Sequence, residues 1–344
     1  MAETTHFSGQ LDEAWLARHT EEILEPNLPI IDPHHHLWRL PGSLYLLPEF
    51  LSDISSGHAV KATIFEECHS MYRADGPAEL RSLGETEFAT GVAAMSASGE
   101  FGPARVCAGI VGNIDLMLGE QVDRLLDLHV ASSGGRFAGV RYSTAWHPSE
   151  LVPKVAPEPH LLADTRVRAG IACLARRGLT FDAWVYHHQI GEVADLAAAF
   201  PEMPIVLCHF GTPILGGPNA TRQEDVFREW REAVSALAKH DNVHVKLGAL
   251  PIRRGGTNRQ ASKEPLSSIE IANGWRPFVE ACVDLFGANR CMFESNFPVQ
   301  KRWCSYAVLW NACKRLASGA SADEKLALFA GNAARVYRLP AGLV

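Results

Sequence analysis

Short apolar runs alternate with longer amphipathic stretches along most of the chain. The short runs are rich in β-branched and aromatic residues, and the longer stretches repeat apolar residues at helical spacing. Eight strands are predicted, at residues 30–34, 59–66, 105–111, 137–142, 180–186, 204–209, 243–247 and 290–296. Helices are predicted at 78–97, 119–132, 164–177, 190–199, 222–239, 275–286 and 302–317, with a closing helix pair at 321–337.

The regular alternation of eight strands with helices favours a closed barrel over an open sheet. A doubly wound sheet usually carries a glycine-rich phosphate loop after its first strand, whereas histidines follow the first strand here and no GxGxxG or GxxxxGK[ST] occurs. We therefore expect an α/β fold, a slightly distorted (β/α)8 TIM barrel with C-terminal helices. Residues 1–29 are expected to form an N-terminal extension and residues 30–344 a single barrel domain.

Composition narrows the class of protein. The chain has 344 residues, of which 47% are hydrophobic, which is ample for a large core. A net charge of -7 with dispersed basic residues argues against nucleic acid or an anionic membrane as a partner, but it is compatible with a small anionic substrate. Neither an apolar run of membrane-spanning length nor a secretory signal is evident, so we expect a cytoplasmic protein. The sequence does not decide whether the protein forms a homo-oligomer.

The eight cysteines are scattered and form no CxxC pair. Several lie inside apolar runs, as Cys107 and Cys208 do. Buried, reduced thiols account for this pattern better than a disulfide framework does.

Polar and titratable residues stand at or near the carboxyl ends of the predicted strands. In a barrel these ends meet at one mouth, where active sites form, and that convergence is the main functional signal. The polar stretches 216–225 and 252–268 follow the sixth and seventh strands and belong to the same face. The residues at the strand ends are Asp32, His34, His35, His36, Glu66, Glu67, Cys68, His69, Arg141, Tyr186, His187, His188, Gln189, His209, Lys246, Glu294, Ser295 and Asn296.

The sequence around His34 and His36 indicates a metal site. Two residues apart on an extended segment, both imidazoles point the same way, and His209 ends another strand. Such imidazole sets bind zinc and similar divalent ions and leave a position open for water. A hydrogen-bonded turn is the alternative. We expect one divalent metal at most, and operation without metal stays open.

Several motifs together resemble the amidohydrolase superfamily. They are IDPHHHLW, GVRY, HHQI, CHFGTP, FESNFPV and the terminal FAGNAARVY, spread from about residue 29 to residue 339. The likeness is greatest to the amidohydrolase-related branch, which contains sugar-lactone, sulfomuconolactone and pyrone-dicarboxylate lactonases. The resemblance implies a TIM-type barrel, hydrolysis of a small cyclic ester and a site built on His34, His36 and His209.

One position departs from that resemblance. The branch usually ends its eighth strand in Ser-Asp-aromatic-Pro, where the Asp activates water or binds the metal, but Asn296 stands here. An amide is no general base and is a poorer ligand than a carboxylate. Glu294, two residues earlier on the same strand face, could supply the missing carboxylate to a metal or to water. The alternative is that Glu294 pairs with Lys246 or Arg141 as barrel-interior structure.

Further residues are candidates for binding or catalysis. Arg141 could hold a substrate carboxylate in a bidentate contact, or form an interior ion pair. His188 follows the fifth strand and is a catalytic candidate, whereas His187 could face a helix. Lys246 and Glu67 are candidate substrate-binding residues. Glu67 and the nearby His69 could have a functional role, or they could simply be loop residues without one. Trp38 and Tyr45, and also Trp146, could form substrate walls or serve only in packing. Tyr142 and Trp184 are expected in the core.

The leading functional hypothesis is a hydrolase that opens a small lactone of a sugar acid or an aromatic breakdown product. Water would attack the carbonyl, activated by a metal or by Glu294, with His209 and His188 among the catalytic residues. The first alternative is a decarboxylase of an aromatic acid, against which Asn296 counts because related decarboxylases usually keep the acidic residue. The second is a binding protein that has lost turnover. Hydrolysis by a catalytic serine is not expected, because the chain has no GxSxG motif. Redox chemistry with a nucleotide is not expected either, because the chain has no glycine-rich phosphate loop.

Overall fold

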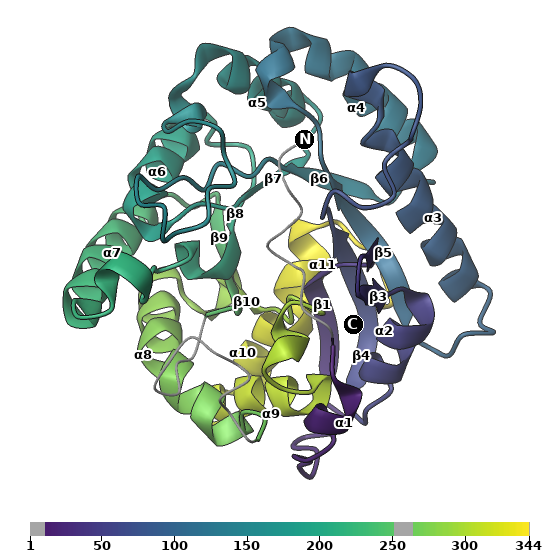
Figure 1. The fold of residues 1–344 in the computed structure, drawn as a ribbon, viewed down its shortest axis with the longest axis vertical. Coiled ribbons are helices and arrows are strands. Elements are labelled where there is room, and N and C mark those ends of the chain that lie inside the picture. Colours follow the sequence, from purple (N-terminus) through teal and green to yellow (C-terminus); the bar gives the residue numbers. More distant parts are fainter. Residues whose placement is uncertain (1–10, 251–263, 344) are drawn as a thin grey trace.

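The computed structural model describes residues 11–250 and 264–343 of the chain. Part of the predicted loop 252–268 lies outside these residues. Eight parallel strands form one sheet in the order β1-β4-β5-β6-β7-β8-β9-β10, which confirms the predicted barrel (Figure 1). The strands are β1 (Pro29–His35), β4 (Ala59–Glu66), β5 (Arg105–Gly112), β6 (Phe137–Arg141), β7 (Thr180–Ala183), β8 (Ile205–Leu207), β9 (Val243–Leu247) and β10 (Cys291–Phe293).

Helices surround the strands, and most lie close to their predicted positions (Figure 1). The main differences are that the first begins later, after a short 3-10 turn at Ala78–Leu80, and that the helix before β10 begins earlier, after the N-cap Ser267. The barrel helices are α3 (Leu83–Ala97), α4 (Val122–Ser132), α5 (Thr165–Arg176), α6 (Ile190–Ala199), α7 (Gln223–Leu237), α8 (Ser268–Phe286) and α9 (Tyr306–Leu316). No helix among the described residues is long and apolar enough to cross a membrane.

Three strands end earlier than the apolar pattern predicts. β7, β8 and β10 stop at Ala183, Leu207 and Phe293. After β8, His209 and Phe210 adopt the left-handed conformation with φ values of 55° and 56°, which no strand allows. The chain therefore leaves the sheet where the predicted site residues begin.

The segment after β1 holds elements that the sequence pattern did not predict. An antiparallel hairpin joins β2 (Trp38–Leu40) to β3 (Ser43–Tyr45), and α2 (Leu47–Ile54) follows it. Gly42 turns the hairpin with a φ of 74°, a conformation that costs glycine little. Upstream, only α1 (Glu13–Leu16) is helical within the described part of the lead-in.

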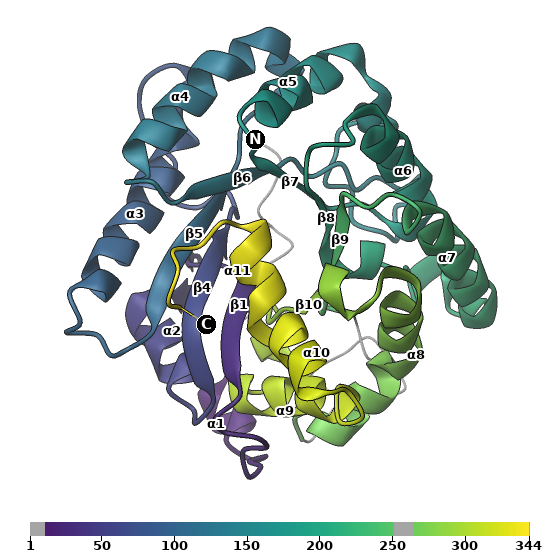
Figure 2. The ribbon, with the colours of Figure 1, turned by 180° about the vertical axis from the view of Figure 1, so that it is seen from behind.

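The last helices close the amino-terminal end of the barrel. α10 (Ala322–Leu326) and α11 (Asn332–Val336) are joined by a π-helical turn. They cross the face of the molecule that is turned toward the viewer in Figure 2. Interior strand residues such as Ile31, Val206 and Met292 pack against Ala333 and Tyr337 from these helices. Because this end is filled with apolar side chains, the polar groups are left at the opposite, carboxyl end. All eight cysteines are free and buried, as the sequence predicts.

A seam joins the first and last strands of the barrel. No regular ladder links β1 to β10 among the described residues. Instead the Asn296 amide donates to the His34 carbonyl at 2.9 Å, and the His36 amide donates to the Phe297 carbonyl at 2.8 Å. The amide and hydroxyl of Ser295 donate to the Asp32 carboxylate at 3.1 and 2.5 Å. The bonds that close the barrel therefore come from the segments that carry the candidate site.

Candidate active site

Backbone strain gathers where strands end at the mouth. His69 and Met71 follow β4, His209 and Phe210 follow β8, and Asn296 follows β10, all with φ between 51° and 57°. Residues with side chains rarely adopt this conformation, and such outliers concentrate at functional sites. The strain thus marks the same face of the barrel that the titratable residues mark.

His34 and His36 lie side by side in the mouth and are almost fully buried. Their Nε2 atoms are 3.2 Å apart. The Nδ1 atom of His36 lies 2.8 Å from the Glu66 carbonyl and must donate to it, which leaves the lone pair on Nε2. Burial and the charge of a neighbouring cation, Lys246 for His34 and Arg141 for His36, hold the pKa values of both histidines well below the usual range. Both imidazoles are therefore neutral.

Glu294 lies between two histidines. Its Oε1 accepts from His209 Nδ1 at 2.7 Å, and its Oε2 lies 2.7 Å from His34 Nδ1. Glu294 Oε1 therefore holds the proton of His209 on Nδ1 and leaves its Nε2 unprotonated, while His34 Nδ1 lies between Glu294 Oε2 and Lys246 Nζ, which is 3.4 Å away. The alternative partners Lys246 and Arg141 bind other carboxylates, so the structure does not show the ion pair considered for Glu294.

Asn296 stands beside the same histidines. Its Oδ1 atom lies 3.1 Å from His36 Nε2, and its side chain is buried. His36 Nε2 thus lies about 3 Å from two other acceptors, His34 Nε2 and Asn296 Oδ1. Three neighbouring acceptors repel one another unless a cation or a proton lies among them.

This donor set fits a divalent metal. Two nitrogens bound tetrahedrally to zinc at about 2.0–2.1 Å lie roughly 3.3–3.4 Å apart, close to the separation of His34 and His36. A second combination, His34 with His209 and Glu294, brings its donor atoms within 4.8 Å of one another. The carboxylate behind two histidines is also the arrangement that orients metal-binding imidazoles.

Arg141 brings positive charge to the histidines. Its Nε donates to Glu67 Oε1 at 2.6 Å, and its Nη2 donates to the Glu67 carbonyl. Its Nη1 lies 3.3 Å from His34 Nε2, and the guanidinium lies 5.4 Å from the centre of the Trp184 ring. Arg141 therefore forms the interior ion pair considered for it and also presents Nη1 to the centre of the site, while a contact with a substrate carboxylate stays a prediction.

Lys246 lies beneath the histidines and away from the mouth. It is fully buried, and its Nζ donates to Glu66 Oε2 and to Asp182 Oδ2, each at 2.8 Å. Burial opposes the charge, but the two carboxylates outweigh it and raise the pKa of Lys246. The ammonium group thus occupies the place between Glu66 and Asp182, with His34 Nδ1 3.4 Å away, and its role in substrate binding stays a prediction.

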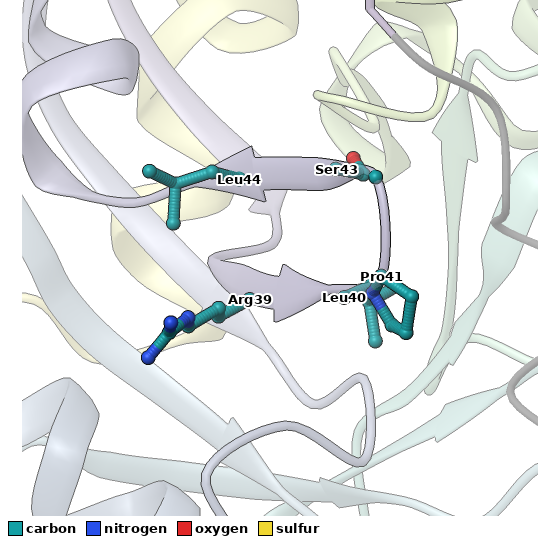
Figure 3. Close-up of a pocket in the computed structure, with 6 residues that line it drawn as sticks. Arg39, Leu40, Pro41, Ser43 and Leu44 are labelled. Carbon is teal, nitrogen blue, oxygen red and sulfur yellow. The ribbon is translucent and has the colours of Figure 1, made fainter.

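The predicted aromatic walls are packed behind the site. Trp38 stacks on His36 at 5.9 Å between ring centres and donates to Ser43 Oγ at 3.0 Å. The Tyr45 hydroxyl donates to Asp53 Oδ2 at 2.5 Å, and both aromatic side chains are buried. Trp38 and Tyr45 pair with each other in the β2–β3 hairpin. Figure 3 shows this hairpin, with Arg39 and Leu44 on its two neighbouring strands. A hollow of about 690 Å³ lies against the hairpin turn.

The two histidines after β7 differ in environment. His187 is buried and its Nδ1 accepts from the Ile214 amide at 3.4 Å, whereas His188 is exposed. The His188 ring lies 5.3 Å from that of His147. No contact of His188 with the His34–His209 centre is found among the described residues, so its catalytic role stays a prediction.

Two supporting acids were not singled out by sequence reasoning. Asp32 binds Ser295 across the seam and accepts from the Tyr306 hydroxyl at 3.0 Å. Glu85, on α3, accepts from the amides of Cys68 and Ser70 through Oε1, at 3.0 and 2.8 Å. Asp32 lay in the strand-end pattern, but a helical glutamate such as Glu85 carries no sequence signal that separates it from a solvent-exposed one.

The pH dependence of stability offers a test of Glu85. Burial and the charge of Glu67 raise the pKa of Glu85 to about 8, above its ordinary value of 4.5. The folded protein therefore holds a proton that the unfolded chain releases, and stability falls as pH rises from 4.5 to 8, by about 1 kcal/mol per unit. Glu85→Gln keeps the accepting oxygen and should flatten this fall. Urea unfolding at pH 5 to 8 measures it, and an unchanged slope contradicts the assignment.

Comparison with known proteins places the chain in a family. A sequence profile described as Amidohydrolase matches residues 31–339. An uncharacterized protein, y4mH of Sinorhizobium fredii, is 32% identical across 91% of this chain and 99% of its own length. L-fucono-1,5-lactonase of Burkholderia multivorans is 26% identical across 90% and 96%. A zinc-bound crystal structure of an amidohydrolase from the same organism is 25% identical, with a TM-score of 0.68 over 90% of this chain and 99% of that one. The chain belongs to the amidohydrolase family.

Proposed function

We propose that the protein is a hydrolase that opens a small lactone by attack of water on the ring carbonyl. The observation that carries the proposal is Glu294, whose two oxygens lie 2.7 Å from the Nδ1 atoms of His34 and His209. The contact with His209 leaves a basic Nε2 on that ring and supports the positive charge that forms when the ring accepts a proton. Two similar proteins named L-fucono-1,5-lactonase support a lactone as the substrate class.

His209 is the residue best placed to deprotonate the attacking water. It is 6% exposed, whereas His34 is fully buried. Its Nδ1 is held by Glu294, so a proton taken up at Nε2 turns the ring into an imidazolium beside a carboxylate. Arg141 Nη1, 3.3 Å from His34 Nε2, supplies positive charge to the carbonyl oxygen as it becomes an oxyanion.

His34, His36 and Asn296 are the residues that would hold a divalent metal, and His209 with His34 offers the other combination. Bound there, such an ion supplies Lewis-acid polarisation of the carbonyl and a lower pKa for water. A zinc-bound relative supports this proposal.

A substrate panel tests the proposal. It contains L-fucono-1,5-lactone, D-glucono-1,5-lactone, the aryl lactone dihydrocoumarin and a set of hydroxybenzoates, each with enzyme as purified, after chelation, and with added zinc. We expect acid release from at least one lactone and no carbon dioxide from the hydroxybenzoates. Carbon dioxide release with every lactone left intact would establish the decarboxylase alternative. No turnover in any arm would favour the non-catalytic binder.

A further inference from the structure

A second histidine–carboxylate pair lies at the rim of the mouth. The His69 side chain is 50% exposed, and its Nδ1 lies 3.8 Å from Glu67 Oε2. The Glu67 side chain is 1% exposed, and its Oε2 has no hydrogen-bond partner within the described part of the chain. A buried carboxylate oxygen that faces an exposed imidazole can accept from Nδ1 and direct Nε2 toward the mouth. Such contacts are often long before substrate binds.

Glu67 is ionised and can play this part. Burial alone would raise its pKa, but the charge of Arg141 outweighs burial, so the pKa of Glu67 falls below its ordinary value. The Oε1 atom is committed to Arg141 Nε at 2.6 Å, which leaves Oε2 for His69. The two oxygens therefore serve two different partners.

The loop that carries His69 is held in a strained shape. His69 and Met71 both have a φ of 57°. Glu85 binds the amides on either side of His69, those of Cys68 and Ser70. Beneath the loop, a side chain at Gly84 would come within 2.6 Å of the Met71 carbonyl, so the helix can approach this closely only with glycine. The strain is therefore maintained by contacts that position His69.

Arg141 ties this pair to the histidine centre. The same guanidinium that binds Glu67 presents Nη1 to His34 Nε2 at 3.3 Å. A continuous row of polar contacts thus runs from His69 through Glu67 and Arg141 to His34. Carbonyl activation at one end and proton transfer at the other are both required to open a lactone ring.

We propose that His69 is the general acid that protonates the leaving ring oxygen, a role that rests on the proposed lactone hydrolysis. Water oxygen bonds to the carbonyl carbon, and its proton passes to His209 Nε2. The bond from the carbonyl carbon to the ring oxygen then breaks. The ring oxygen keeps the electron pair and takes the proton of His69 Nε2. Both imidazoles return to their starting protonation by exchange with solvent, and the product is the open hydroxy acid.

The test compares leaving groups. A sugar 1,5-lactone expels an alkoxide, which needs protonation, whereas dihydrocoumarin expels a phenoxide whose conjugate acid has a pKa of about 10. Loss of a general acid lowers rates by roughly 10²–10⁴ where protonation matters. His69→Gln should therefore lower kcat for D-glucono-1,5-lactone or L-fucono-1,5-lactone by roughly 100-fold or more, and for dihydrocoumarin by less than about 5-fold. Added imidazole should restore part of the sugar-lactone rate.

His240→Gln is the matched control, because His240 precedes β9 at the opposite end of the barrel. Equal losses on both lactones without imidazole rescue would show a structural role and overturn the inference. Unchanged rates on both would overturn it as well, while lactone hydrolysis by the wild type still stood. If the wild type opens no lactone, the proposed function itself fails, and the role of His69 fails with it.

Discussion

Glu294→Gln is expected to lower kcat by roughly 10²–10⁴-fold with the barrel intact. The carboxylate accepts from His209 Nδ1 and places its second oxygen 2.7 Å from His34 Nδ1, but an amide offers one accepting oxygen and one donating nitrogen. One of the two rings must then shift its proton to Nε2, where the water or a metal has to bind. Loss of a carboxylate behind a catalytic histidine lowers turnover by about 10⁴-fold in a well-studied hydrolase, through the same change of tautomer.

Steady-state kinetics on the best lactone of the panel measure this effect, with circular dichroism and urea unfolding to show that the variant is folded. Zinc affinity provides a second readout and should fall by roughly 10–100-fold. Glu280→Gln, on the exposed face of α8, is the control and should match the wild type. A Glu294→Gln enzyme with full kcat and full zinc affinity would show that the carboxylate neither positions the histidines nor supports charge.

Lys246→Met is expected to destabilise the protein by about 3–5 kcal/mol, because it removes one partner of a buried ionic cluster. The ammonium group is fully buried and bonded to Glu66 and Asp182 at 2.8 Å. Methionine fills similar volume but leaves Asp182 without its cation and Glu66 with only Arg141, whose Nε lies 3.5 Å from Glu66 Oε1. The Tyr337 hydroxyl donates to Asp182 at 2.5 Å and cannot neutralise the charge.

Urea unfolding gives the free energy difference, and Lys239→Met, at an exposed position just after α7, serves as the surface control. A triple variant that adds Glu66→Gln and Asp182→Asn removes the unpaired charges and should regain much of the lost stability. If Lys246→Met alone unfolds during purification, the triple variant still tests the explanation. Wild-type stability in Lys246→Met would mean that the cluster contributes no net stabilisation.

The sequence predicted the barrel well because periodicity reports burial. The alternation of apolar runs with helical patterns located all eight strands, and the histidines at the first strand end located the mouth. The end of β7 was overestimated because the apolar residues Trp184 and Val185 continue past the strand. The predictions for β8 and β10 ran on to His209 and Asn296, whose left-handed backbone lies outside the strand. Hydrophobicity alone does not show where a strand ends.

The sequence could not predict which side chains Glu294, Lys246 and Arg141 contact. The period-two argument placed Glu294 on the face of the site, but it could not decide among a metal, a water molecule, Lys246 and Arg141, and it did not consider the two histidines that Glu294 contacts. Lys246 and Arg141 appeared equivalent as basic residues on interior strands. Only the three-dimensional contacts separate a lysine saturated by two carboxylates from an arginine with a free edge toward His34.

The seam between β1 and β10 has a consequence for how this barrel can change. Its hydrogen bonds use the backbone of His34, His36 and Asn296, and so the residues that set the chemistry also hold the ends of the sheet together. A substitution that adapts the site to a new substrate therefore acts on barrel closure as well. Laboratory evolution would be better directed at the loop that follows β6, where side chains can vary without opening the barrel.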